Sequence, residues 1–196
     1  TSATDVSLTL QAHNSIIFDT QSTSPITISA TGTGALDLVL QPDSDNDRFG
    51  GIEFFTGIST AFPITLALNG GSLRTFGEVA VLGENGLTLS DVNWYLDRPM
   101  TVDQTASLSV LDAAGSSVTL AVGRGGSLGI FGGMTGNVRV EDDGFLFGDG
   151  VITGNVLVAG GGISGGNGQI SGGVLDISGE LQIDRGLVYA VLGGLS

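Results

Sequence analysis

The segment DSDND carries three aspartates at alternate positions, Asp43, Asp45 and Asp47. Carboxylates spaced in this way open a calcium-binding loop, because Ca²⁺ takes several oxygen ligands from closely spaced residues. A full loop of the EF-hand type also needs Gly at its sixth position and Glu at its twelfth. Those positions hold Arg48 and Phe54. We therefore expect either a calcium site or an acidic surface loop with a local counter-charge, and no other cofactor.

The segment VNWYL contains the only tryptophan and a candidate binding site for carbohydrate. Alternation with a period of two turns Trp94 and Leu96 toward a core. The same alternation turns Asn93, Tyr95 and Asp97 toward solvent. An exposed aromatic ring with hydrogen-bonding neighbours suits a sugar. The sequence thus predicts a sugar contact at Tyr95 and Asn93, the alternative being an ordinary surface tyrosine.

No set of residues predicts catalysis. Glu141 and Asp143 in EDDG converge if this segment is a strand, whereas Asp142 then points to the other side. A glycosidase pair would also need a deep cleft, and a corner turn is the favoured interpretation. His13 is the only histidine and has no serine or carboxylate partner that the sequence identifies. We expect a protein that is not an enzyme.

Short stretches in which apolar and polar residues alternate predict half-buried β-strands along the whole chain. Clusters of Gly, Asn, Asp and Ser, which favour turns, separate these stretches. The expected strands are residues 6–10, 26–29, 36–40, 64–68, 87–96, 106–111, 118–122, 137–140, 155–158 and 175–178. No stretch has the periodicity of an amphipathic helix.

An internal repeat indicates how these strands are arranged. TGNV recurs at 135–138 and 153–156, and Val174 follows Val156 at the same spacing as Val156 follows Val138. A constant step of this size suits one coil of a β-solenoid, whose coils stack about 4.8 Å apart. The sequence therefore predicts an all-β parallel β-helix with about 18–20 residues per coil and about ten coils.

Glycines are expected at the corners of the coils, because they allow tight turns and close backbone approach. Residues 121–196 hold 23 glycines and residues 1–120 hold 11. We therefore expect residues 1–196 to form one solenoid segment, with longer loops in 1–120 and tighter coils in 121–196. The predicted interior residues are Val138, Val140, Val156, Val158, Val174, Leu181 and Ile183.

The charge of the chain narrows its possible partners. The 20 acidic and 6 basic residues give a net charge of −14, and every basic residue is an arginine. Such a chain repels nucleic acid and anionic lipid surfaces. The chain has no cysteine, which excludes disulfides and thiolate metal sites. No apolar stretch reaches the length of a membrane helix, so membrane insertion is not expected. Because of the negative charge, nucleic-acid binding is not expected either.

Residues 6–54 resemble the repeats of filamentous-haemagglutinin-like exoproteins of the two-partner secretion pathway. The resemblance rests on a pattern LxAxNxIxF followed by GxLxLxLxxDxDxxxxGxI. The matching residues are Leu10, Ala12, Asn14, Ile16, Phe18, Gly34, Leu36, Leu38, Leu40, Asp43, Asp45, Gly51 and Ile52. Residues 154–183 look like coils of an autotransporter passenger.

The resemblance implies a right-handed β-helix that a Gram-negative bacterium secretes or displays at its surface. It also implies an outer-membrane secretion partner. The asparagine-proline motifs of the family's secretion domain and a barrel translocator are absent, so we expect a β-helical stalk segment of a longer protein. Adhesion is the common role of the family, with a glycan or protein of a host or neighbouring cell as partner.

Three functions therefore remain open. The first is a structural or adhesive segment of a secreted surface exoprotein, either a stalk or a binding module. The second is a polysaccharide lyase or hydrolase built on a β-helix. The third is the subunit of an extracellular filament that assembles by stacking of coils end to end. Scattered arginines and the absence of lysine favour the first.

Overall fold

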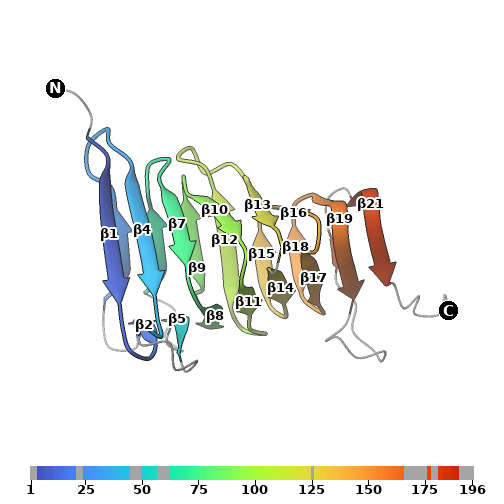
Figure 1. The fold of residues 1–196 in the computed structure, drawn as a ribbon, viewed down its shortest axis with the longest axis horizontal. Helices are drawn as coiled ribbons and strands as arrows, with labels where there is room; N and C mark the ends of the chain where they lie inside the picture. The colour runs from blue at the N-terminus through green and yellow to red at the C-terminus, as the bar shows by residue number, and fades with distance from the viewer. Residues whose placement is uncertain are drawn as a thin grey trace.

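A computed structural model describes residues 4–20, 24–44, 50–56, 62–124, 126–165, 176–177 and 181–189. These residues form β-strands joined by turns, and the described part of the chain contains no helix. Successive strands stack in parallel along one axis, and the first and last described strands lie at opposite ends of the stack (Figure 1). The predicted all-β parallel β-helix is confirmed. No helix among the described residues is long and apolar enough to cross a membrane.

Each coil contributes one strand to each of three faces, which we call A, B and C. Face A holds β1 (Val6–Gln11), β4 (Leu36–Gln41), β7 (Ser72–Thr75), β10 (Asn93–Leu96), β13 (Thr119–Val122), β16 (Asn137–Val140) and the first part of β19 (Val156–Gly165). Face B holds β2 (Ile16–Asp19), β5 (Gly51–Thr56), β8 (Glu78–Gly83), β11 (Pro99–Val102), β14 (Ser127–Ile130), β17 (Phe145–Gly148) and the second part of β19.

Face C is a separate sheet of seven strands. It holds β3 (Ile26–Ser29), β6 (Ile64–Ala67), β9 (Leu87–Ser90), β12 (Ser107–Leu111), β15 (Gly133–Thr135), β18 (Val151–Thr153) and β20 (Asp176–Ile177). Faces A and B form one continuous sheet because β19 runs along both. The last strand, β21 (Leu181–Tyr189), pairs with β19.

The alternating residues of most strands explain this arrangement. In β4 and β5, buried and half-buried positions alternate without interruption, so one apolar row of each strand faces the bore. The parallel register then places apolar residues of neighbouring coils on top of one another, for example Leu38 on Leu73 and Val138 on Val156. The predicted interior positions Val140 and Val158 are buried as well. The structure does not describe the side chains of Leu181 and Ile183.

The number of residues per coil changes along the rod. Val138 pairs with Leu120 on one side and with Val156 on the other, at equal spacing, so the predicted coil length holds for β13 to β18. Earlier coils are longer, as the pairing of Ile26 with Ile64 and of Val79 with Met100 shows. The three strands of a coil keep their place, and only the connections lengthen. The described part of the chain therefore has seven strands on face C, fewer than the ten coils expected.

The prediction that a third copy of the repeat places Val174 next to Val156 is wrong. Val156 pairs with Leu181, further along the chain than the expected partner position, Val174. Val174 itself lies outside the described residues. The sequence after β19 is so rich in glycine and serine that several frames fit the same pattern, and only strand pairing distinguishes them.

Candidate functional site

The outer surfaces of faces A and C differ in chemistry, and this difference points to the site. On face C, one row of hydroxyl side chains lies in register along successive coils. Its members are Thr27, Thr65, Thr88, Ser109, Thr135 and Thr153. Threonine packs well on a pleated surface, so a uniform row of this kind is accounted for by sheet formation. Face A instead carries aromatic, amide and charged side chains, which sheet formation does not require.

Strand β10 positions the residues that the sequence predicts for sugar binding. Its burial alternates, with Trp94 and Leu96 in the core and Asn93 and Tyr95 on the outer surface of face A. Tyr95 is 50% exposed, which makes it one of the few large side chains open to solvent. The predicted orientation of β10 is therefore confirmed. Asn93 is partly engaged already, because its side-chain amide donates a hydrogen bond to the Gly70 carbonyl.

Small residues on the next coil make room for the ring of Tyr95. Tyr95 pairs with Ala121 of β13, and its ring lies over Gly123. A Cβ atom at position 123 would collide with the ring carbons and the hydroxyl oxygen of Tyr95. Gly123 therefore allows the tyrosine to lie along the rod, where one side of the ring is supported by the neighbouring coil.

Two hollows that contain arginines flank Tyr95 on face A, and the tyrosine also lines a third hollow, formed with Asp91, Val92, Asn93, Trp94, Val118 and Thr119. The hollow toward the N-terminal end, the Arg98 hollow, is lined by Ser72, Leu73, Arg74, Thr75, Phe76, Asn93, Tyr95, Asp97 and Arg98. The hollow toward the C-terminal end, the Arg124 hollow, is lined by Tyr95, Arg124, Arg139, Glu141, Asp142, Asp143 and Ala159. The Arg98 hollow thus contains two guanidinium groups and one carboxylate. The Arg124 hollow contains two guanidinium groups and three carboxylates.

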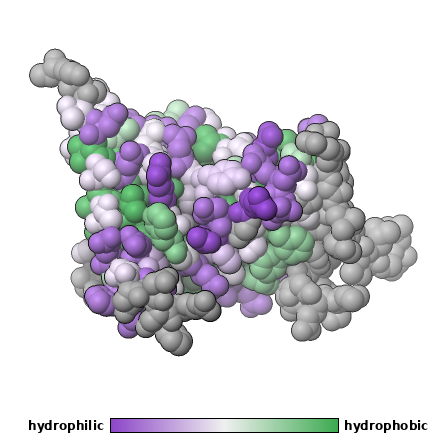
Figure 2. Space-filling view, in the orientation of Figure 1, coloured by the Kyte–Doolittle hydropathy of each residue, from purple (hydrophilic) through white to green (hydrophobic). Residues whose placement is uncertain are grey.

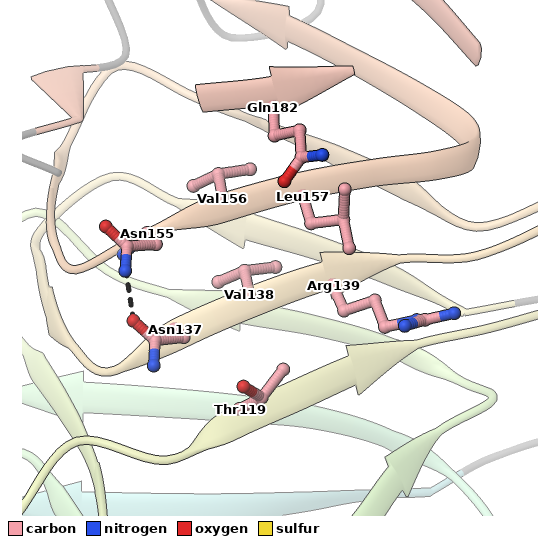
Figure 3. A pocket seen from close by; sticks show the side chains of 8 residues that line it. All are labelled: Thr119, Asn137, Val138, Arg139, Asn155, Val156, Leu157 and Gln182. Atoms are coloured by element: carbon pink, nitrogen blue, oxygen red, sulfur yellow. Dashed lines mark hydrogen bonds between the residues drawn. The ribbon is translucent and has the colours of Figure 1, made fainter. Parts of the chain in front are cut away.

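A further hollow on the same face is lined mainly by uncharged polar groups (Figure 3). Thr119, Asn137 and Asn155 occupy equivalent outward positions on three successive coils. The backbone N–H of Asn155 donates to the side-chain oxygen of Asn137 at 2.9 Å. Gly154, with φ at 156°, lies against the backbone oxygen of Gly136, and this close approach requires glycine. The repeated TGNV segment therefore builds an amide row on face A.

The hollows succeed one another along the rod. Strands β1, β4 and β7 of face A lie toward the viewer in Figure 1. In the same orientation, Figure 2 shows hydrophilic side chains across the middle of this surface, with apolar patches between them. A surface of this kind offers contacts to a long, thin molecule that lies along the axis of the rod.

The acidic segment 141–144 forms a turn, as favoured from the sequence, so the alternation of a strand does not apply. Glu141, Asp142 and Asp143 all line the Arg124 hollow, whereas a strand would have turned Asp142 away from the other two. Glu141 accepts a hydrogen bond from the Arg139 side chain at 3.1 Å. Asp143 lies 3.7 Å from Arg124. Two of the three carboxylates are therefore paired with arginines.

Asp37 on β4 is a titratable residue of face A that the sequence did not single out. The hydroxyl of Ser72 donates to its carboxylate at 2.6 Å and the backbone N–H of Ser72 at 2.8 Å. These two hydrogen bonds hold the pKa of Asp37 below its ordinary value, and the charge of Arg74 adds a smaller effect in the same direction. The pair joins two coils that are separated by a long connection.

The predicted calcium site falls mostly outside the described residues. Asp45 and Asp47 are not described, whereas Asp43 lies just after β4 with a positive φ of 54°. Its backbone N–H donates to the Asn14 carbonyl at 3.0 Å. Within the described ranges, no three His, Asp or Glu side chains are grouped as a metal site would need. His13 lies exposed in the turn between β1 and β2.

No protein-family model, curated protein or solved structure matches the chain.

Proposed function

We propose that this chain is a binding segment of a secreted bacterial surface exoprotein of the adhesin type, and that it holds an extended polymer on face A. One observation carries the proposal: Tyr95 projects from the middle of face A and lines the hollows on both sides of it. The polymer that fits best is a glycan, because the aromatic ring offers a stacking surface and the neighbouring amides and hydroxyls offer hydrogen bonds.

The open shape of the hollows favours a polymer over a small molecule. Sites for small molecules are concave and cover most of the surface of their ligand. The hollows of face A are open to solvent and follow one another from β7 to β19. A chain of sugars that touches several of them gains affinity from many modest contacts.

The proposed location outside the cell rests on the resemblance of residues 6–54 to exported repeats. The absence of cysteine fits a chain that crosses membranes unfolded and folds afterwards without disulfides. Export by the same route would require an outer-membrane secretion partner.

The proposal is tested with an array of glycans and matrix proteins, probed with the whole chain in the presence and absence of calcium. We expect a specific glycan signal that Tyr95→Ala lowers at least about fivefold, because a stacked ring contributes on the order of 1 kcal/mol. Ile17→Ala, at a side chain on face B that is 57% exposed, is the matched control and leaves binding unchanged. A folded protein that gives no signal would favour a stalk without a binding role.

The same preparations separate binding from catalysis. Incubation of acidic and neutral polysaccharides with the chain, followed by measurement of new chain ends, detects a lyase or hydrolase. Clear turnover that Glu141→Gln or Asp143→Asn abolishes would replace the binding proposal with an enzymatic one.

Self-association is a second candidate function, and the first coil supports it. Val6 and Leu8 of β1 occupy inward positions, in register with Leu36 and Leu38, yet they are 58% and 38% exposed. An apolar strand of this kind offers its edge to another coil. Light scattering over a range of concentrations tests the idea, and a constant monomer mass would exclude it.

A further inference from the structure

The arginines of this acidic protein are not scattered over its surface. The structure does not describe the side chains of Arg48 and Arg185. The four that the structure describes are Arg74, Arg98, Arg124 and Arg139. All four line the two hollows beside Tyr95. A chain with a net charge of −14 thus concentrates its described cations on one face.

The same arginines form a ladder with one guanidinium on each of four successive coils. Arg74 lies in β7 and Arg98 follows β10; Arg124 follows β13 and Arg139 lies in β16. These strands are consecutive neighbours on face A. Coils stack about 4.8 Å apart, so the ladder extends over roughly 14 Å of the rod. A short stretch of an extended polymer covers that length.

The two ends of the ladder differ in how far their charge is already neutralised. Arg124 and Arg139 have acidic partners, Asp143 and Glu141. Arg74 and Arg98 make no ion pair with another described residue, although the charge of Arg74 acts on Asp37 and the Asp97 carboxylate lines the same hollow. The Arg98 hollow therefore presents guanidinium groups beside the exposed rings of Phe76 and Tyr95.

This combination selects the chemistry of the ligand. A guanidinium group binds carboxylate or sulfate with two parallel hydrogen bonds, which a neutral sugar does not provide. An aromatic ring binds the apolar face of a sugar, which a simple polyanion lacks. The net charge of the protein disfavours dense polyanions such as nucleic acid.

We propose that the arginine ladder and Tyr95 bind an acidic polysaccharide. Its carboxylate or sulfate groups meet Arg74 and Arg98, and one of its sugar rings lies against Tyr95. This inference rests on the proposed function and names the class of its ligand.

The test measures binding of oligogalacturonate by calorimetry at two salt concentrations. The methyl ester of the same oligomer is the matched neutral ligand, because it keeps the sugar backbone and loses the charge. We expect the acid to bind at least about tenfold more tightly than the ester at low salt, and the difference to shrink as salt screens the guanidinium groups. Sulfated dextran against dextran distinguishes sulfate from carboxylate as the preferred group.

The double variant Arg74→Gln, Arg98→Gln removes the unpaired end of the ladder. We expect it to weaken binding of the acid about tenfold and to leave binding of the ester unchanged. Thr65→Asp with Ser109→Asp is the matched control, because it changes the net charge equally on face C and leaves face A intact. This control is expected to retain most of the affinity.

A second variant works in the opposite direction. Glu141→Gln frees Arg139 from its partner, so we expect it to strengthen binding of the acid by about threefold.

Equal affinity for the acid and its ester, with Tyr95→Ala still weakening both, would overturn the acidic-ligand inference and leave the proposed glycan function standing. Equal binding of single-stranded DNA and oligogalacturonate would also overturn the inference, because it would show attraction to any polyanion. Failure of acid, ester and dextrans alike to bind a folded protein would count against the proposed function itself.

Discussion

The long coils before β13 and the short coils from β13 to β18 enclose the same bore by different means. In the long coils, large side chains fill the interior, as in the stacked rings of Phe18 and Phe54, whose centroids lie 4.9 Å apart. In the short coils, Ile130 and Gly148 occupy the positions in register with these rings, and glycines let backbones touch at the corners. The comparison teaches that the cross-section depends on the strands, whereas the connections absorb the difference in length.

The largest effect is expected from emptying the bore of a long coil. Phe54→Ala removes a fully buried ring and leaves a cavity against Phe18, which should lower the free energy of unfolding by about 3–5 kcal/mol. Val140→Ala in a short coil removes much less volume and should cost roughly 2 kcal/mol. Chemical denaturation followed by circular dichroism measures both. Equal costs would show that the two regions are packed alike.

The next effect tests the close backbone contacts of the short coils. Gly148 has a φ of 134°, and a Cβ atom there would collide with the Ile130 carbonyl oxygen of the neighbouring coil. Gly148→Ala should therefore lower the free energy of unfolding by about 3 kcal/mol or more, from strain and collision together.

Gly115 supplies the control, because its φ of 83° is also positive but no atom lies within 4 Å of the added Cβ. Gly115→Ala should cost only about 1–2 kcal/mol, the backbone penalty alone. A thermal melt of each variant gives the comparison. If both alanine variants melt together, close approach is not what sets the short coils apart.

A smaller effect tests how the long coils fix their connections. The buried hydroxyl of Thr56 accepts hydrogen bonds from the backbone N–H groups of Asn85 and Gly86, at 3.0 and 3.1 Å. Thr56→Val leaves these donors without that partner and should cost about 1–3 kcal/mol.

The matched substitution is Thr75→Val, because the buried hydroxyl of Thr75 has no hydrogen-bond partner among the described residues. This change should be neutral or slightly stabilising, since it removes an unpaired polar group. Urea unfolding of the two variants side by side distinguishes them. A larger loss at Thr75 than at Thr56 would reverse the assignment.

The smallest effect is a dependence on pH that belongs to the long coils. Because hydrogen bonds from Ser72 lower the pKa of Asp37 in the folded state, the unfolded chain binds the proton more readily. The resulting stability is present above the ordinary pKa of aspartate, about 3.9, and is lost as the pH falls through the folded value. Asp37→Asn should remove this part of the acid dependence. Denaturation midpoints between pH 5 and pH 2 check it, and parallel curves for both proteins would contradict it.

The alternating residues were sufficient to predict most strands of faces A and C and the direction in which their side chains point, but they missed the strands of face B and treated β9 and β10 as one strand. Trp94 and Val138 face the bore and Tyr95 faces solvent, as a period of two requires. The repeat TGNV was sufficient to predict parallel stacking, because Asn137 and Asn155 come into register only when one coil lies directly on the next. Alternation is a local property of the backbone, so the sequence reveals it without knowledge of the partners.

Strand pairing across long connections decided which coils are neighbours. The sequence does not show that Leu38 meets Leu73, or that Val156 meets Leu181, because glycine-rich and polar connections leave their own length undetermined. For the same reason, arginines that are widely separated in the sequence gave no sign of a common face. By itself, the sequence determined the type of fold and the orientation of the strands with clear alternation. Only the tertiary structure decided which coils are neighbours, and therefore which side chains surround Tyr95.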